Sequence, residues 1–466
     1  MKLERLLGMF LILVTACFFI ACNEEESKTD GDAEQEEQSD LLSVTAPPNW
    51  NPNPHRTPKY LHMTYQHDPA NHVTMQWQTE DVDEKKYIPK VWFIKADELN
   101  GVDPYKFDEN VDMPYAERLV ATGGNQKYCR LILCVGNVPL DGQQWEVELE
   151  GLEPNTHYYY RVGTWESFDE DKGEFVNPDL SPVYHFQSGL PKGSAESFVF
   201  GFGSDSQGWF PDTGDKLTHI RSHTGREARF WLHGGDLTEW TSQENLWDFF
   251  EVFSPLLHYF PLMATQGNHD AFDGLFYGEF AMPVPEGLPE NLHELIWSFN
   301  YGNVHFLGYK SITESLVEVL APWVEKDLKA ASSDPDITWI IVYAHHPTYS
   351  SAGTHGSTDY IQTWLMPFFD QYHADVVFSG HVHDYERSKP MKGGQIVAPG
   401  EGTLYIVSGG FYSQKWYQNG TADFTEVSVN GDIKNYVIMT ADTKTLTGVA
   451  YSGAHDQIDT FTLTKE

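Results

Sequence analysis

The chain has few cysteines and few basic residues, and both shortages limit what it can be. It contains four cysteines in 466 residues, so no dense disulfide framework can hold it together. It carries 30 lysines and arginines against 68 aspartates and glutamates, a net charge of −38, and no basic stripe is visible. Because nucleic-acid backbones are bound mainly by lysine and arginine, we expect no nucleic-acid-binding surface.

The N-terminal apolar run is short for a transmembrane helix, which needs about 20 residues. It extends from Leu6 to Ala21 and ends at Cys22, and two basic residues, Lys2 and Arg5, precede it. A basic start, an apolar segment and an abrupt polar switch are typical of a secretory signal. We therefore interpret residues 1–22 as a signal peptide rather than a membrane anchor helix.

The end of this segment, Phe19 to Cys22, resembles a bacterial lipobox, in which the cysteine becomes the lipidated first residue. The resemblance implies lipidation at Cys22 and a lipid-anchored place in the bacterial cell envelope. We expect the outer membrane, with the protein facing the periplasm or the exterior. Cys17 is a second candidate, but apolar residues would then follow the lipidated cysteine. Residues 23–45 are acidic and lack aromatic side chains, so we expect a disordered tether.

The two remaining cysteines, Cys129 and Cys134, lie five residues apart in a stretch that we expect to be a single strand. An odd spacing along one strand places side chains on opposite faces. We therefore expect no disulfide between them.

Residues 46–190 contain short runs of alternating apolar and polar residues, a pattern that favours a β-sandwich with one wet face. After Pro191 the pattern changes to strands interleaved with amphipathic helical stretches, and it returns to strands near the C terminus. The sequence therefore predicts two domains, 46–190 and 191–466. The helical stretches are 217–220, 246–253, 323–329 and 361–369.

Five apolar, strand-like runs in the second domain each lead directly to residues that can bind a metal ion. Sites in α/β sheets collect at the carboxyl ends of strands, so we expect these residues to meet at one edge. A cluster of mixed oxygen and nitrogen donors is typical of a two-metal hydrolase. The six candidate ligands are Asp205, Asp236, Asn268, His345, His381 and His383.

The order of these motifs (Asp, GD, GNHD, HHP, GHVH) resembles the calcineurin-type metallophosphoesterase superfamily. The longer strings 297–306, 345–349 and 380–387 resemble the purple acid phosphatases, and the resemblance runs from about Pro58 to the C terminus. It implies a fibronectin type III-like sandwich followed by a four-layer α-β-β-α catalytic domain. It also implies a binuclear phosphatase that cleaves phosphomonoesters with a metal-activated hydroxide, outside the cytoplasm.

The resemblance assigns a role to each matching residue. Asp236 bridges the two metals, Asp205 and His383 complete one of them, and Asn268, His345 and His381 complete the other. His269 and His355 fall where the family places histidines near the phosphate and the leaving group. Asp270 either orients the ring of His269 or ends the loop.

Two positions depart from the family pattern. Glu239 stands where the family has a tyrosine whose phenolate binds ferric iron, and Gln207 stands where related enzymes often have a histidine ligand. Either side chain could be an extra metal ligand, so the metals could be iron, zinc or manganese. Two other functions stay open: a phosphodiesterase or nucleotide hydrolase with the same centre, and a non-catalytic surface-binding lipoprotein.

Overall fold

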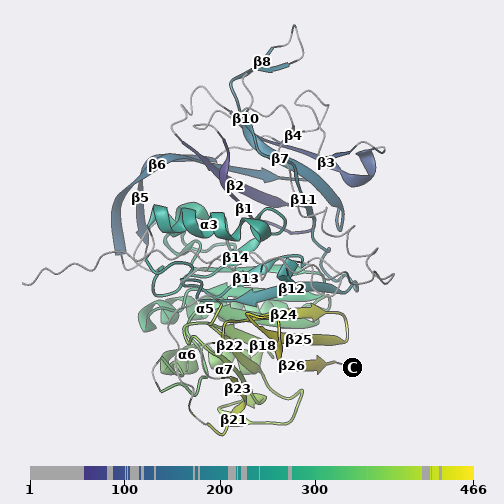
Figure 1. Cartoon of the computed structure of the whole chain (residues 1–466). Coiled ribbons are helices and arrows are strands. Elements are labelled where there is room, and N and C mark those ends of the chain that lie inside the picture. Colours follow the sequence, from purple (N-terminus) through teal and green to yellow (C-terminus); the bar gives the residue numbers. More distant parts are fainter. Residues whose placement is uncertain are drawn as a thin grey trace, which may run out of the picture. The chain divides into compact units, whose positions relative to one another are not determined.

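The structure is a computed structural model of the chain (Figure 1). It divides into two units, Met1–Thr45 and Ala46–Glu466. Lipidation at Cys22 and the acidic tether lie outside the described residues. None of the helices in the described part is long and apolar enough to cross a bilayer. The described residues are 57–80, 88–99, 101, 103–104, 115–116, 120–130, 133–169, 171, 174–176, 179–207, 217, 219–221, 228–240, 242–270, 275–353, 355–411, 420, 422–429 and 433–465.

The N-terminal part forms two β-sheets. The first contains, in spatial order, β1 (Lys59–Thr64), β2 (Val73–Thr79), β6 (Leu133–Leu149) and β5 (Val120–Arg130). The second contains β10 (Asp179–Leu180), β7 (His157–Trp165), β3 (Ile88–Lys95) and β4 (Tyr115–Ala116), with β11 (Tyr184–Gln187) also paired to β7. A short hairpin, β8 (Ser167–Asp169) with β9 (Glu174–Val176), and a 3-10 turn, Ala96–Leu99, complete it.

Inward side chains of both sheets share one hydrophobic core. Trp77 and Trp145 are register partners on β2 and β6, and both are fully buried. Tyr160 and Val162 from β7 pack into the same cluster. Before β7 the chain turns a corner, where the hydroxyl of Tyr158 accepts a hydrogen bond of 2.8 Å from the amide of Glu153.

The expected position of the two cysteines is wrong. Cys129 lies on β5 and Cys134 on β6, and they are register partners across this antiparallel pair. The premise that they sit in one strand on opposite faces therefore fails, because the chain reverses between them. Between the paired residues Arg130 and Leu133 the sequence has Leu131 and Ile132, so no Gly, Pro, Asn or Asp marks the reversal.

The C-terminal part, from residue 191 onward, is the part that the resemblance implies is catalytic, and it contains two large sheets (Figure 1). The first has the order β14 (Leu262–Ala264), β13 (Trp231–His233), β12 (Phe198–Gly203), β24 (Asn435–Ala441), β25 (Thr445–Ser452) and β26 (Gln457–Thr464); β12, β13 and β14 are parallel. The second has the order β15 (Ile296–Tyr301), β16 (Val304–Tyr309), β17 (Trp339–Ala344), β18 (Val376–Ser379), β22 (Leu404–Ser408), β19 (Tyr385–Ser388) and β23 (Thr425–Val429). Its strands β16, β17, β18 and β22 are parallel.

Alternating residues of the second sheet pack on its two faces. Phe306, Ile341 and Phe378 join the core shared with the first sheet. Their neighbours Leu307 and Val342 pack on the other side, in a cluster with the helices listed next. These are α5 (Glu314–Ser333), α6 (Asp359–Trp364) and α7 (Met366–Gln371); α3 (Gln243–Leu257) packs in the core of the first sheet.

The predicted helix 361–369 is in fact two helices. α6 ends at Trp364 and α7 begins at Met366, with Pro367 in the first turn of α7. Proline has no amide hydrogen to continue the ladder of α6, and it disfavours helical backbone in the residue before it. The remaining short elements are α4 (Leu275–Glu279), the 3-10 turn Glu290–Leu292, β20 (Met391–Lys392) and β21 (Gln395–Ile396).

The N-terminal sheets contact the catalytic part through α3 and α4. The ring of His62 on β1 stacks on Phe250 of α3 at 4.2 Å between centroids. Gln78 on β2 accepts a hydrogen bond from the indole of Trp247 (2.5 Å) and donates one to the buried carboxyl of Glu279 (2.6 Å). The two parts are therefore held by specific buried polar contacts as well as by apolar packing.

Candidate metal centre

The six predicted ligands follow the carboxyl ends of parallel strands from both catalytic sheets. Asp205, Asp236 and Asn268 come after β12, β13 and β14, and His345 after β17. His381 and His383 both come after β18. The two sheets pack face to face. Ligand residues that are far apart in the sequence therefore meet at one edge of the pair.

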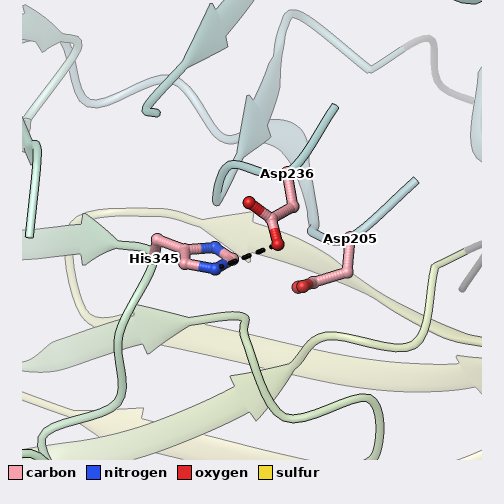
Figure 2. A group of neighbouring side chains, drawn as sticks. All are labelled: Asp205, Asp236 and His345. Carbon is pink, nitrogen blue, oxygen red and sulfur yellow. Dashed lines mark ion pairs between the residues drawn. The ribbon is translucent and has the colours of Figure 1, made fainter. Parts of the chain in front are cut away.

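The centre of the site is formed by Asp205, Asp236 and His345 (Figure 2). One ligand atom from each of these side chains lies within 4.8 Å of the other two, and all three residues are buried. The Nε2 atom of His345 is 3.3 Å from Oδ2 of Asp236. Its other nitrogen, Nδ1, donates to the carbonyl of Gly234 at 3.0 Å, which points Nε2 into the site.

The other three predicted ligands adjoin this group. Oδ1 of Asn268 is 3.0 Å from Nε2 of His345, and Nδ1 of His381 is 3.2 Å from that same nitrogen. On the other side, Nε2 of His383 is 3.3 Å from Oδ1 of Asp205. The structure therefore brings all six side chains together, with Asp236 and His345 between Asn268 on one side and Asp205 on the other.

The loops that carry the ligands have strained backbone. Asp205, Asp236 and His381 have φ values of 63°, 51° and 68°, in the left-handed region that side chains other than glycine rarely adopt. A Cβ at Gly267 would lie 1.9 Å from Oδ1 of Asp236, so only glycine fits beside this carboxylate. Such strain persists only where the surrounding structure enforces it, which is typical of functional sites.

The electrostatics of the site reflect closely packed charges. Burial lowers the pKa of His345, but the carboxylates of Asp236 and Asp205 outweigh it and raise that pKa to about 9. Burial opposes ionisation of Asp205, yet the charge of His345 and the contact with His383 hold its pKa below the usual value. Oδ1 of Asp205 is buried and accepts no hydrogen bond from the described part of the chain. Carboxylate, amide and imidazole donors that converge in this way fit metal ions.

The two residues that depart from the family pattern behave differently. Gln207 lies against the group formed by Asp205, Asp236 and His345, and its amide nitrogen donates a hydrogen bond of 2.9 Å to Oδ2 of Asp236. Glu239 meets the site through its backbone, since its carbonyl accepts a hydrogen bond of 2.6 Å from Nδ1 of His269. Gln207 therefore contacts a predicted ligand with its side chain.

His269 and Asp270 have separate contacts. The Glu239 carbonyl fixes the ring of His269, whose Nε2 faces Oδ2 of Asp236 at 4.0 Å. The buried carboxyl of Asp270 accepts from the amides of Leu237 and Gly267, at 3.2 and 3.1 Å. Asp270 therefore joins the two ligand loops and is not the group that orients the neighbouring ring.

His355 contacts a ligand directly. Its Nδ1 is 3.0 Å from Nε2 of His381, the nitrogen that faces away from His345. His346 packs on the ring of His381 at 4.3 Å and forms hydrogen bonds with Ser311, through its amide at 2.8 Å and Nδ1 at 3.2 Å. The sequence analysis missed Ser311 and the carbonyl of Gly234. Ser311 follows the parallel strand β16, so the strand-end argument could have found it.

Two family models match the chain. The model described as calcineurin-like phosphoesterase matches residues 198–385, and the one described as the N-terminal domain of purple acid phosphatase matches residues 58–188. The fold and the site thus define a metallophosphoesterase. Since one model matches each domain and relatives named purple acid phosphatase match most of the chain, the chain is a purple acid phosphatase-like member of the calcineurin-type superfamily, an acid phosphatase-like hydrolase.

Named relatives agree with this assignment. The chain is 25% identical to purple acid phosphatase 18 of Arabidopsis thaliana, over 78% of this chain and 73% of the relative. It is 26% identical to a purple acid phosphatase of Glycine max, over 83% and 76%. The structure of purple acid phosphatase PPD1 from yellow lupin (Lupinus luteus) seeds superimposes with a TM-score of 0.68 and 18% identity, covering 88% of this chain and 75% of that one.

Proposed function

We propose that the protein is a binuclear metallophosphatase that hydrolyses phosphomonoesters outside the cytoplasm. The observation that carries this proposal is the convergence of six oxygen and nitrogen donors from five strand ends around Asp236 and His345. Asp236 would be shared by both metals, with Asp205 and His383 on one and Asn268, His345 and His381 on the other. Two bound cations suit a dianionic phosphomonoester better than a singly charged diester.

The residues of the chain would contribute positioning and proton transfer. Two bound cations supply positive charge for the phosphate and make water nucleophilic near neutral pH. Nδ1 of His269 donates to the Glu239 carbonyl, which fixes the ring, and in the imidazolium form Nε2 would donate a hydrogen bond or a proton at the phosphate. Asp270 holds the Asp236 loop against the Asn268 loop. His355 could protonate the leaving group or keep His381 oriented through its contact at 3.0 Å.

A panel of phosphate esters with purified protein tests this function. We expect two metal ions per chain by elemental analysis and faster cleavage of phosphomonoesters than of the corresponding diesters. Faster diester cleavage would establish the phosphodiesterase or nucleotide hydrolase alternative instead. Two bound metals without any hydrolysis would favour a non-catalytic surface-binding lipoprotein.

We further propose the finer architecture and the location. The shared core of the N-terminal sheets and the Tyr158 hydroxyl bond at the corner before β7 support a fibronectin type III-like sandwich, at residues 46–190. The packing of helices outside both catalytic sheets supports a four-layer α-β-β-α domain, at residues 191–466. The lipobox-like sequence ending at Cys22 supports a lipid-anchored protein of the bacterial envelope.

A further inference from the structure

We propose that the ring of Trp240 is an aromatic subsite beside the metal centre, which selects phosphomonoesters whose organic group carries an aromatic ring. This inference rests on the proposed phosphatase function and adds a substrate class to it. The common chemistry is a flat aromatic ring in the organic group of the ester. In an aryl phosphate the ring is bonded directly to the ester oxygen, and in a nucleotide the ribose separates the two.

The exposure of Trp240 calls for an explanation. Four large hydrophobic side chains are exposed among the residues that the structure describes, and Trp240 is the one aromatic among them. Its exposed fraction, 67%, is also the highest of the four. A tryptophan offers a large, flat apolar surface on which an aromatic ring of a ligand can stack.

The position of Trp240 identifies the ligand as part of the substrate. The residue lies on the loop of Asp236, four positions further along, and its ring is 5.6 Å from the ring of His269. The Nε2 atom of His269 is in turn 4.0 Å from Oδ2 of Asp236. A phosphate at the metals whose ester oxygen faces His269 would therefore extend its organic group toward Trp240.

The loop fixes the backbone that carries this ring before any ligand arrives. The carbonyl of Glu239 accepts a hydrogen bond of 2.6 Å from His269, and the carbonyl of Trp240 itself accepts one of 2.6 Å from Nδ2 of Asn245. Asn245 is in the first turn of α3, which Ser242 caps through the amide of Asn245. A ring on a fixed backbone loses less conformational entropy when a ligand stacks on it, which favours binding.

Kinetics with paired substrates test the subsite. In the metal-loaded enzyme, Trp240→Ala should raise KM for phenyl phosphate about 2- to 13-fold more than KM for ethyl phosphate, the range expected for loss of one aromatic pair. Trp240→Phe should restore most of the difference, whereas Trp240→Leu, which keeps apolar area without a ring, should not. Adenosine monophosphate against ribose 5-phosphate tests whether the ring is a nucleobase. Val319→Ala, an exposed site on α5, is the matched control and should change neither ratio.

A binding measurement separates this inference from the proposed function. Phenylphosphonate should quench tryptophan fluorescence of the metal-loaded wild type more than methylphosphonate, and Trp240→Phe should remove that difference in quenching. The subsite would be overturned, and the phosphatase left intact, if the ratio of KM for phenyl phosphate to KM for ethyl phosphate were the same in wild type and Trp240→Ala. Equal affinity of these two proteins for phenylphosphonate would have the same consequence. A wild type that hydrolyses no ester would overturn the phosphatase, while tighter binding of phenylphosphonate to wild type than to Trp240→Ala would still support the ring as its contact.

Discussion

Asp236 contacts three other groups of the site in the described structure. Its Oδ2 faces His345 at 3.3 Å and accepts from Gln207 at 2.9 Å, and its Oδ1 accepts from the amide of His269 at 2.8 Å. Asn268 contacts only the His345 side of the group. The two residues should therefore differ in what their removal does.

The first prediction concerns metal content. Asp236→Ala should lose both metals, because a shared ligand is removed, whereas Asn268→Ala should weaken mainly one site. Elemental analysis of the purified variants after dialysis measures this directly. Two metals per chain in Asp236→Ala would contradict the bridging role. Glu286→Ala, an exposed acidic site, controls for the loss of one negative charge.

A second prediction at this scale concerns colour. The purple phosphatases owe their visible band to a tyrosine phenolate on ferric iron, and Glu239 occupies that place. Its carbonyl accepts a hydrogen bond from His269, and a carboxylate cannot supply the phenolate that gives the band. The iron-loaded protein should therefore lack the broad visible band, whereas Glu239→Tyr should gain it if the side chain reaches the metal. An intense band in the wild type would mean that another tyrosine binds iron.

At the scale of elements, the short helix α4 places one unusual carboxyl at the contact with β2. Glu279 is 2% exposed, and burial raises its pKa to about 8 despite the hydrogen bond from Gln78. The folded state therefore binds the proton more tightly than the unfolded chain, whose glutamates titrate near pH 4.3. The stability from this site is fully present below that pH and is lost as the pH rises through about 8.

The third prediction follows from this sign. Glu279→Gln keeps an oxygen for Gln78 but cannot ionise, so it should stabilise the protein at pH 8 and change little at pH 4. The gain should grow by about 1.4 kcal/mol per pH unit between the two pKa values. Denaturant unfolding at several pH values measures it, with exposed Glu286→Gln as the control. A constant difference between Glu279→Gln and wild type across this range would contradict the prediction.

Elements whose sequence carries its own signal were predictable, and those set by distant contacts were not. The runs ending at Gly203, Ala344 and Ser379 are buried strands, and period and length alone indicate them. The reversal between Cys129 and Cys134 was missed, because Leu131 and Ile132 between the paired residues carry no turn signal. Motif order placed the six ligands on strand ends, whereas the partners of His355 and Asp270 depend on loop backbone that no periodicity encodes.

At the scale of the whole molecule, the proposed lipid anchor determines where the catalytic domain works. No helix of the described part could cross a membrane, and the proposed anchor at Cys22 lies outside that part. Between this cysteine and Ala46 lie 23 residues, rich in acid and free of aromatics, which would act as a solvated spacer. An active site on such a spacer could reach soluble esters some distance from the lipid surface.

The last prediction tests this anchor. In a Gram-negative host the full-length protein should incorporate labelled palmitate and enter the detergent phase, because two or more acyl chains hold a protein stably on a membrane. Cys22→Ser should abolish both, whereas Cys17→Ser should change neither, since apolar residues would follow Cys17 as a lipidated first residue. Labelling that persists in Cys22→Ser and disappears in Cys17→Ser would move the anchor to Cys17. If neither the full-length protein nor the variants incorporate palmitate, the apolar run is a cleaved secretory signal and the enzyme is not attached to the membrane.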